Sequence, residues 1–336
     1  QTCYKYCFAA KYESKYISNL LANPKLQRRI ELAQESLKKE AAKTVRGHSE
    51  QVKWLNKLTI DGSYLEFLNK TLTVGTRQYN KICASATRII DGHIKYNIDQ
   101  TSGRFHSNVT NLAKVLRPYL RIDGQPLVNC DISNSQPYLS TILLTNPSKV
   151  SGFAKNPAFA MMLTTLKVSL AKDVKNYIFL VSTGTLYDFL QDKFRANGLE
   201  LNRKETKVQV LRILFARNRS PKDETNRQAR AIFKANFKTV HRIFSKVRGS
   251  EKGDKFTSFK RFAILLQSVE SFLMLDVILK RIYRELPGTI AVTVHDSVMT
   301  GLLTNNVEAV RKIMEEELTF FVGMTPQIKI EGLERE

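Results

Sequence analysis

The sequence is poor in acidic side chains and has no long apolar run. It holds 31 Asp and Glu residues against 53 Lys and Arg residues, which gives a formal net charge of +22 at pH 7. No run of about 18 apolar residues occurs, so we predict no membrane-spanning helix. The sequence also lacks a P-loop and the spaced Asp-x-Glu carboxylates of a proofreading nuclease. Neither of those two activities is therefore indicated.

Cysteine is also scarce, with four residues in the chain: Cys3, Cys7, Cys83 and Cys130. So few cysteines fit a reducing compartment, and we expect a cytoplasmic protein. Cys3 and Cys7 lie one helical turn apart, but the local sequence does not offer the two further ligands of a zinc site. The chain begins at Gln1 without a methionine or a signal-peptide core, which is typical of a fragment or processed product.

The remaining composition is that of an ordinary soluble globular protein. Hydrophobic residues make up 43% and charged residues 25% of the chain, and its length suits two or three domain-sized units. The positive excess points to a polyanionic partner; a membrane surface would need a basic amphipathic helix with a continuous apolar face. Residues 203–260 carry 17 basic and 5 acidic side chains. The aromatics among them are more typical of core than of base stacking: Phe215, Phe233, Phe237, Phe244, Phe256 and Phe259.

Two segments far apart in the sequence each deliver an aspartate from an apolar strand into a turn. In Leu127 to Ser140, LVNCDISNSQPYLS, the strand ends at Asp131; in Ala291 to Met299, AVTVHDSVM, it ends before Asp296. A carboxylate at the end of a buried strand is costly unless a cation or charged partner is bound there. Asp131 could instead cap the helix that follows it. Together, two carboxylates on stiff strands are what a two-metal phosphoryl-transfer site requires.

A third segment carries a basic helical face. Arg203, Lys207, Leu211 and Phe215 are spaced four residues apart and therefore share one side of a helix. Two cations can offset the charge of a triphosphate, and the apolar continuation can pack on a nucleobase. The alternative is a solvated basic face without a ligand.

These segments resemble motifs A, B and C of the family A (polymerase I-like) nucleotide polymerases, in the order DISNSQ, Arg203-x3-Lys207 and VHDS. The segment Thr101-Ser102-Gly103-Arg104 resembles the family's TGR signature, and Leu266-Gln267-Ser268 resembles its IQG segment. The likeness extends over about residues 101 to 331. The chain is thus similar to a divergent, short family A DNA polymerase of the kind carried by phages and mobile genetic elements.

The resemblance implies an α+β right-hand polymerase with an antiparallel palm sheet, helical fingers and a helical N-terminal thumb. The implied divisions are a thumb-like region at 1–98, palm at 99–146, fingers at 147–260 and palm again at 261–336. Periodicity predicts a loop over 146–160 and a hairpin that turns at His295-Asp296-Ser297. It also predicts a strand over Gln327–Glu331. The predicted helices are Gln27–Lys43, Tyr64–Leu72, Arg77–Arg88, Pro137–Leu144, Arg261–Arg284 and Val307–Phe321.

The resemblance also implies roles for individual residues. Two Mg²⁺ ions per site, with Mn²⁺ as an alternative, would be held by Asp131, Asp296 and the carbonyl of Ile132. The incoming nucleotide would be bound by Arg203, Lys207, Leu211, Phe215 and Gln136, with Lys207 also acting in catalysis. Primer and template would be contacted by Arg104, Arg117, Gln267 and His295, and Arg121 would suit a strand phosphate. Ordinary turn residues are the alternative for Arg104 and His295, and a buried structural glutamine for Gln267.

The chain departs from the family at several of these positions. The family has an aromatic residue where Leu211 stands and usually a tyrosine where Phe215 stands. Its DNA polymerases typically have a glutamate after the motif C aspartate, whereas Ser297 matches the phage-type single-subunit RNA polymerases. Gln136 replaces the glutamate that excludes a ribose 2′-hydroxyl in the DNA polymerases.

The expected activity is that of a DNA-directed DNA polymerase, which extends a primer 3′ end with deoxynucleoside triphosphates. Its partners would be a DNA primer-template, dNTPs and an accessory protein or upstream domain, with no membrane. A primase or RNA polymerase on the same palm, a terminal transferase and a nucleic-acid-binding protein with a decayed site remain alternatives. Retention of Asp131, Arg203, Lys207 and Asp296 together argues against decay.

Overall fold

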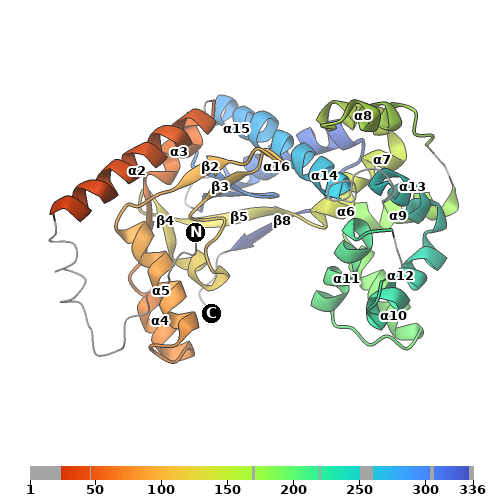
Figure 1. The fold of residues 1–336 in the computed structure, drawn as a ribbon, viewed down its shortest axis with the longest axis horizontal. Coiled ribbons are helices and arrows are strands. Elements are labelled where there is room, and N and C mark those ends of the chain that lie inside the picture. Colours follow the sequence, from red (N-terminus) through yellow and green to blue (C-terminus); the bar gives the residue numbers. More distant parts are fainter. Residues whose placement is uncertain are drawn as a thin grey trace. The chain divides into compact units, whose positions relative to one another are not determined.

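A computed structural model describes residues 24–45, 47–168, 171–218, 221–249, 260–302 and 306–332 (Figure 1). The predictions for Cys3, Cys7, Phe256 and Phe259 lie outside these described residues. The chain divides into two compact units. The first comprises Gln1–Ile98, His106–Gly124 and Arg335–Glu336, and the second comprises Asp99–Phe105 and Gln125–Glu334.

The first unit is mostly helical, as predicted for the N-terminal region. Its helices are α2 (Pro24–Thr44), α3 (Ser49–Leu55), α4 (Tyr64–Thr71), α5 (Arg77–Ile90) and the 3₁₀ helix η1 (Lys114–Tyr119). Helix α5 begins after Thr76, whose hydroxyl accepts a hydrogen bond from the Tyr79 amide at 3.3 Å. The predicted helices are confirmed to within a few residues. Short strands that the sequence reading missed are β1 (Leu58–Ile60), β2 (Tyr96–Ile98), β3 (Phe105–Ser107) and β4 (Leu120–Ile122), and β1 pairs antiparallel with β4.

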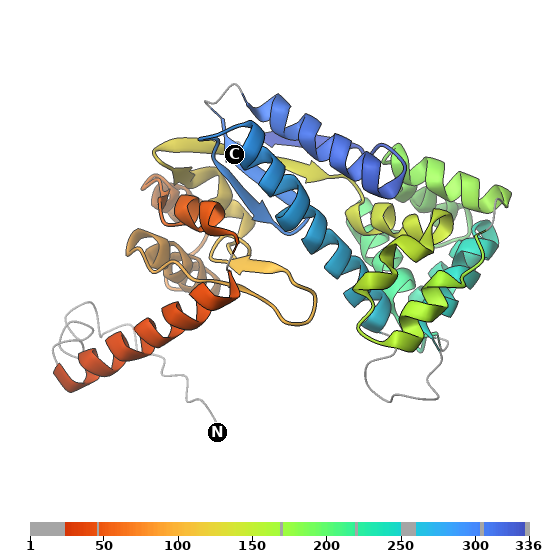
Figure 2. The same cartoon turned by 90° about the horizontal axis from the view of Figure 1, so that it is seen from above.

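The second unit is built on an antiparallel sheet. Its central strand β5 (Gln125–Ile132) pairs on one side with β7 (Ser297–Gly301) and on the other with β8 (Ile328–Gly332), and β6 (Ala291–Val294) pairs with β7. Leu127, Val128, Cys130 and Ile132 of β5 and every residue of β6 and β7 are buried. The helices α15 (Leu279–Glu285) and α16 (Val307–Val322) pack against these strands, as Figure 2 shows from above. The strand predictions, including Gln327–Glu331, are confirmed to within a few residues.

Helix α15 ends a continuous helical run that starts with α14 (Arg261–Ser271) and includes a π-helical turn, Phe272–Ile278. The predicted long helix Arg261–Arg284 is confirmed. By length and composition alone the run could cross a membrane, but 61% of its most apolar window is buried within the protein. That burial is typical of a core helix.

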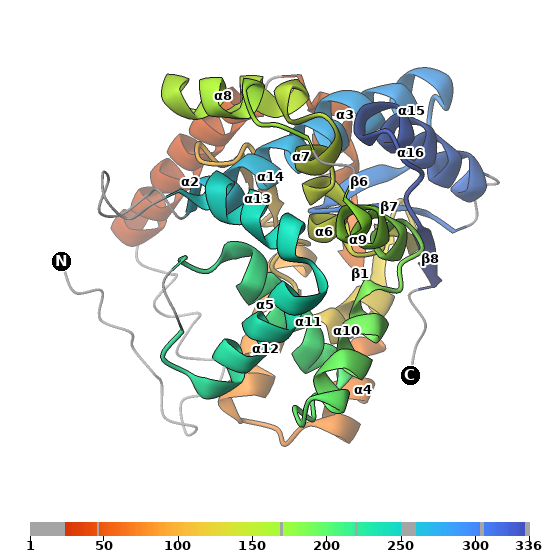
Figure 3. The ribbon, with the colours of Figure 1, turned by 90° about the vertical axis from the view of Figure 1, so that its right-hand side faces the viewer.

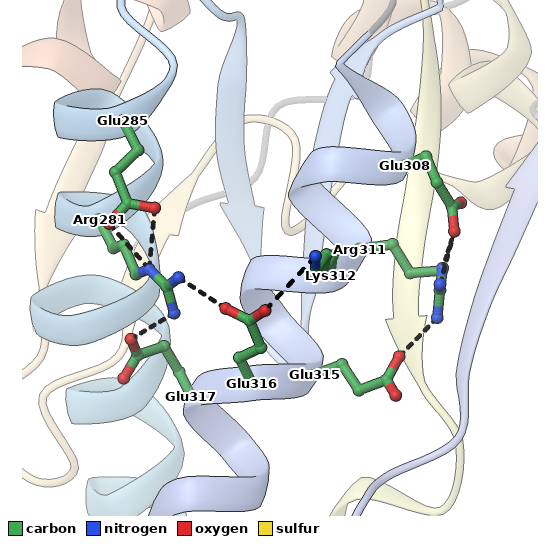
Figure 4. A network of polar contacts seen from close by, with 8 residues as sticks. All are labelled: Arg281, Glu285, Glu308, Arg311, Lys312, Glu315, Glu316 and Glu317. Atoms are coloured by element: carbon green, nitrogen blue, oxygen red, sulfur yellow. Dashed lines mark hydrogen bonds and ion pairs between the residues drawn. The ribbon is translucent and has the colours of Figure 1, made fainter.

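Ion pairs join α15 to α16 across the sheet-covering layer (Figure 4). Arg281 on α15 forms ion pairs with two residues of α16, Glu316 at 2.6 Å and Glu317 at 2.8 Å. It also pairs with Glu285 on α15, at 3.0 Å. On α16, Arg311 pairs with Glu308 and Glu315, and Lys312 with Glu316. The two helices are thus joined by charge as well as by apolar packing.

The remainder of the second unit is helical (Figure 3). Its elements are α6 (Ser135–Ser140), α7 (Ile142–Thr145), the 3₁₀ helix η2 (Pro147–Phe153), α8 (Pro157–Thr164), α9 (Lys172–Ser182), α10 (Leu186–Ala196), α11 (Arg203–Phe215), α12 (Glu224–Asn236) and α13 (Lys238–Arg248). The loop predicted over 146–160 is wrong, because η2 and α8 occupy most of it. Pro147 and Pro157 stand in first helical turns, where a missing amide hydrogen costs nothing. Asn156 caps α8 by accepting hydrogen bonds from Ala158 and Phe159.

An aromatic cluster holds these helices together. The ring of Tyr177 on α9 lies edge-on to those of Phe233, Phe237 and Phe244, with centroids 6.3, 5.5 and 5.8 Å away. All four side chains are buried. The interpretation of these three phenylalanines as core is therefore confirmed.

A buried arginine ties α13 to the end of α11. Arg248 is 1% exposed and donates hydrogen bonds to the carbonyl oxygens of Ile213 and Leu214, to the Asn218 side chain and to the Ser245 hydroxyl. Burial, together with nearby Arg230, lowers its pKa to about 10. The last carbonyl groups of α11 are thus satisfied by a side chain from another helix.

The chain is a mixed helix and sheet protein with an antiparallel sheet, in agreement with the predicted α+β class. Its division into palm, fingers and thumb stays a prediction.

Candidate functional site

Asp131 lies on strand β5, and Asp296 lies in the turn between β6 and β7, next to the strand that pairs with β5. Asp131 on β5 is the register partner of Ser297 on β7, and the Ile132 amide donates a hydrogen bond to the Asp296 carbonyl at 3.4 Å. Both aspartates are partly exposed. Helix α6 begins after Asn134, so Asp131 is not its N-cap residue. The fold therefore brings together two carboxylates that are 165 positions apart in the printed sequence.

Left-handed backbone conformations lie next to both aspartates. Asn134, three residues after Asp131, has φ 55°, and His295, immediately before Asp296, has φ 58°. Such conformations cost free energy in residues other than glycine and are concentrated at functional sites. The hairpin turn is shorter than predicted, because Ser297 already belongs to β7. Its buried hydroxyl donates to the Val294 carbonyl at 3.0 Å.

A buried glutamate beside this site was missed by sequence reasoning. Glu270 on α14 is 2% exposed. Its Oε1 accepts hydrogen bonds from Arg104 Nε at 3.0 Å and Nη2 at 2.6 Å, and its Oε2 accepts from Gln136 Nε2. Burial raises the pKa of Glu270 to about 7, because desolvation outweighs the charge of Arg104 and the carboxylate of Asp296 adds to the rise. The one signal in the sequence was a lone glutamate within an apolar stretch of helix.

Arg104 is held from both its backbone and its side chain. The carboxylate of Asp99 accepts hydrogen bonds from the amides of Thr101, Ser102 and Arg104 and from the Ser102 hydroxyl, all between 2.7 and 2.9 Å. Burial opposes ionisation of Asp99, but the hydrogen bonds from these neighbours outweigh it and lower its pKa. Arg104 is therefore more than an ordinary turn residue, since its side chain forms a buried ion pair. Its contact with primer or template stays a prediction.

Helix α11 presents the predicted basic face. A capping box starts it, in which Asn202 and Glu205 bond each other's backbone amides at 2.9 Å. One side of the helix is buried through Thr206, Gln209, Val210, Ile213 and Leu214. The predicted face is on the other side: Arg203 and Lys207 are exposed, and Leu211 and Phe215 partly exposed. The predicted helix and its shared face are confirmed.

The side chains on that face differ in their contacts. Arg203 forms an ion pair with Asp188 at 2.8 Å, both side chains being about half exposed. Lys207 has no ion-pair partner in the described part of the chain. The ring of Phe215 lies 5.7 Å from that of Phe262. Lys207 is therefore the cation on this face that is not already paired within the described residues.

Tyr187 is a buried phenol whose pKa is affected by Asp296 and Arg203. The side chain is 3% exposed and belongs to α10. Burial raises its pKa, the Asp296 carboxylate raises it further, and the Arg203 guanidinium lowers it. Asp296 and Arg203 are thus both close enough to Tyr187 to influence its pKa.

The other predicted primer and template contacts differ in position. Gln267 is partly exposed on α14, one turn before Glu270, so it is not the fully buried glutamine considered as the alternative. Arg117 belongs to η1 in the first unit. Arg121, also in that unit, donates to Asp61 at 3.0 Å and to the carbonyls of Pro118 and Leu120 at 2.8 Å. The Arg121 guanidinium therefore has a structural role.

Several polar atoms after Asp131 are buried without a hydrogen-bond partner in the part of the chain that the structure describes. They are Ser133 Oγ, Asn134 Nδ2 and Gln136 Oε1. Folded proteins rarely leave buried polar atoms unsatisfied, and water or a ligand commonly completes their hydrogen bonds. Their concentration within a few residues of Asp131 is what a ligand site would produce.

The donor set suits a hard divalent cation. Carboxylate oxygens of Asp131 and Asp296 and the carbonyl of Ile132 are the ligand type that Mg²⁺ and Mn²⁺ prefer. No group of three or more His, Cys, Asp or Glu residues that could hold a metal occurs among the described residues. Mg²⁺ is commonly held by one or two carboxylates, with water and substrate phosphate as further ligands, so the residues fit it.

Comparisons with known proteins add little to this site. No protein-family model and no curated protein matches the chain. The fold is similar to a solved structure of the POL domain of Pol1 from M. smegmatis in complex with DNA primer-template and dNTP, with a TM-score of 0.40 and 11% identity. The alignment covers 89% of this chain, which spans 65% of that structure. A likeness of this size carries no argument about the site, which rests on the residues described above.

Proposed function

We propose that the protein is a nucleotidyltransferase of the right-hand polymerase class. More specifically, it would act as a family A DNA polymerase that extends a primer 3′ end on a DNA template with deoxynucleoside triphosphates. The observation that carries this proposal is the pairing of β5 with β7, which places Asp131 beside the Asp296 turn. The exposed basic face of α11 belongs to the same compact unit.

The metal site would consist of Asp131, Asp296 and the Ile132 carbonyl. Mg²⁺ or Mn²⁺ bound there would stabilise the charge that develops at the reacting phosphate. Lys207 would bind the triphosphate and offset the charge of the leaving group. Arg203 would assist after exchanging its Asp188 partner for phosphate. Leu211 and Phe215 would pack on the base, and Gln136 would lie against the sugar.

Basic and polar side chains would also contact the nucleic acid. Arg104, Gln267 and His295 of the second unit and Arg117 of the first are the proposed contacts. The proposed fingers span 147–260, the palm 99–146 with 261–336, and the thumb-like region 1–98. In the structure, residues 106–124 group with the first unit. An accessory protein or upstream domain remains part of the proposal.

A second candidate is a primase or RNA polymerase on the same palm. The observation in its favour is Ser297, a small buried residue directly opposite Asp131. The primer-extension experiment described next also distinguishes these polymerases from a terminal transferase and from a nucleic-acid-binding protein with a decayed site.

The test is primer extension on defined DNA templates with dNTPs and rNTPs in parallel, with Asp131→Asn as the inactive control. Template-complementary incorporation of dNTPs by the parent alone supports the proposal. Incorporation without a template would indicate a terminal transferase, and synthesis from rNTPs without a primer would indicate a primase. No incorporation under any condition, with nucleic-acid binding retained, would overturn the enzymatic proposal.

A further inference from the structure

The contact between Glu270 and Gln136 determines which end of the Gln136 amide faces the carboxylate. An ionised carboxylate only accepts hydrogen bonds, whereas an amide has a donor end and an acceptor end. Gln136 therefore turns its Nε2 toward Glu270 Oε2, as observed. Two bonds from Arg104 to Oε1 favour the ionised form of this carboxylate and partly offset the cost of its burial.

The oxygen at the other end of the amide is then left to accept a different hydrogen bond. Gln136 Oε1 is buried and has no hydrogen-bond partner within the described residues. It shares this state with Ser133 Oγ and Asn134 Nδ2 in the same turn. When a ligand donates a hydrogen bond to a buried acceptor that had none, the free energy of the complex is lowered.

We infer that Glu270 is a positioning residue, which fixes the Gln136 amide so that its oxygen accepts a hydrogen bond from a sugar hydroxyl of the incoming nucleotide. The inference rests on the proposed function, because it takes the nucleotide as the ligand. The Gln136 side chain would then have two opposite effects on the binding of a nucleotide with an additional hydroxyl. The bulk of Gln136 disfavours an additional hydroxyl, and its oriented oxygen compensates for part of that penalty.

The geometry separates this role from simple core packing. Glu270 on α14 bonds to residues of two segments far from it in the sequence: Arg104 of the 99–105 segment and Gln136 of α6. A residue needed only to fill space would not require both carboxylate oxygens to be bonded. A leucine or methionine would fill the same space without the cost of burying a charge.

The experiment measures kcat/KM for a ribonucleotide, a deoxynucleotide and a 2′,3′-dideoxynucleotide opposite one template base at pH 8. The variants are Glu270→Gln, which is isosteric but no longer fixes the amide, and Gln136→Met, which keeps the volume but removes the acceptor. Glu285→Gln, the same change at an exposed position on α15, is the matched control. Thermal unfolding of each variant establishes that it is folded.

We expect Glu270→Gln and Gln136→Met each to lower the use of the hydroxyl-bearing nucleotide by about two- to tenfold, the effect of one ordinary hydrogen bond. A lower ratio of ribo- to deoxynucleotide use identifies the 2′-hydroxyl, and a lower ratio of deoxy- to dideoxynucleotide use identifies the 3′-hydroxyl. Adding Glu270→Gln to Gln136→Met should change neither ratio further, since the two act through one bond. The control should match the parent.

Equal losses with all three nucleotides would show a merely structural role for Glu270 and overturn the inference. Unchanged ratios in Gln136→Met would overturn it as well, even if Glu270→Gln does not fold. A parent that extends no primer with any nucleotide would instead contradict the proposed function, and the inference with it.

Discussion

Asp131 at the end of β5 is the register partner of Ser297, the residue that follows Asp296 in the β6–β7 turn. This pairing holds Asp131 within the sheet, with hydrogen-bonded strands on both sides of β5, and holds Asp296 in the turn that leads into the neighbouring strand. A rigid sheet suits a site in which two cations must share ligands within a few ångströms.

The first prediction concerns these aspartates. Asp131→Asn or Asp296→Asn should reduce nucleotide incorporation by several orders of magnitude, because the metal-assisted stabilisation of the transition state is lost. Duplex binding should remain nearly intact. Single-turnover extension and a DNA-binding titration measure the two effects. Asp276→Asn, at an exposed position on the 261–285 helix, is the control. Primer extension by Asp131→Asn or Asp296→Asn at a rate within tenfold of the parent would contradict the assignment.

The second prediction concerns Lys207. Its replacement by alanine should raise the nucleotide KM and lower kcat, because an exposed cation that has no ion-pair partner among the described residues would no longer offset the triphosphate charge. Lys204→Ala, an exposed lysine on the same helix but outside the predicted face, is the matched control. Unchanged nucleotide kinetics for Lys207→Ala would show that α11 does not bind the triphosphate.

The salt dependence of DNA binding separates Lys207 from the other cations of this region. Lys207→Ala should leave the slope of log K against log salt unchanged, since Lys207 would contact the nucleotide only. Neutralising the exposed residues Lys238 and Arg242 should flatten the slope by about one unit per lost phosphate contact.

The third prediction concerns sugar choice. The parent should prefer dNTPs over rNTPs by roughly 10- to 1000-fold, because the volume of Gln136 opposes an additional hydroxyl. Gln136→Gly or Gln136→Ala should reduce this margin, chiefly by improving ribonucleotide use. Steady-state incorporation opposite a single template base measures it. A parent that prefers rNTPs, or a glycine variant with unchanged selectivity, would favour the RNA polymerase or primase alternative.

The fourth prediction concerns stability and pH. The pKa of Glu270 rises from 4.5 to about 7 on folding, so the folded protein binds this proton more tightly than the unfolded chain. Its contribution to stability is fully present below about pH 4.5 and is lost as the pH rises through 7. Relative to Glu270→Gln, the parent should therefore lose stability from pH 4.5 to 8, by an amount on the order of 3 kcal/mol. Urea unfolding of both proteins across this range measures the difference, and parallel curves would contradict it.

The fifth prediction concerns the α15–α16 network. Arg281→Ala should lower the free energy of unfolding by about 1 kcal/mol, because it leaves three carboxylates without their shared partner while solvent screens most of the repulsion. Lys312→Ala removes a single exposed pair at 3.9 Å and should have almost no effect. Chemical denaturation of the two variants side by side tests this, and equal losses would show that the network has no special value.

Local pattern in the sequence predicted much of the site. Apolar runs that stop at Asp131 and Asp296 predicted strand ends, and a four-residue spacing predicted the face of α11. Both signals arise from hydrogen bonding and burial within one segment, so they can be read without the fold. The two helices over 147–164 were not predicted, because their prolines suggested a loop. Each proline in fact lies in the first turn of a helix.

Pairings between distant segments could not be predicted in the same way. Glu270 lies 166 residues from Arg104 and 134 from Gln136 in sequence. Arg121 and Arg203 could both be interpreted from the sequence as phosphate ligands. The structure shows that each is already paired with a carboxylate, Arg121 with Asp61 and Arg203 with Asp188, and the sequence alone did not reveal these pairs. Periodicity reports the burial of a side chain and not the identity of its partner.

Arg248 has a consequence for motion. From the last residue of α13, it donates hydrogen bonds to the Ile213 and Leu214 carbonyl oxygens near the end of α11, and its side chain is buried. A rotation of α11 alone would remove two acceptors from this buried guanidinium, which is costly because buried donors need partners. We therefore expect α11 and α13 to move together in any conformational change that displaces Lys207.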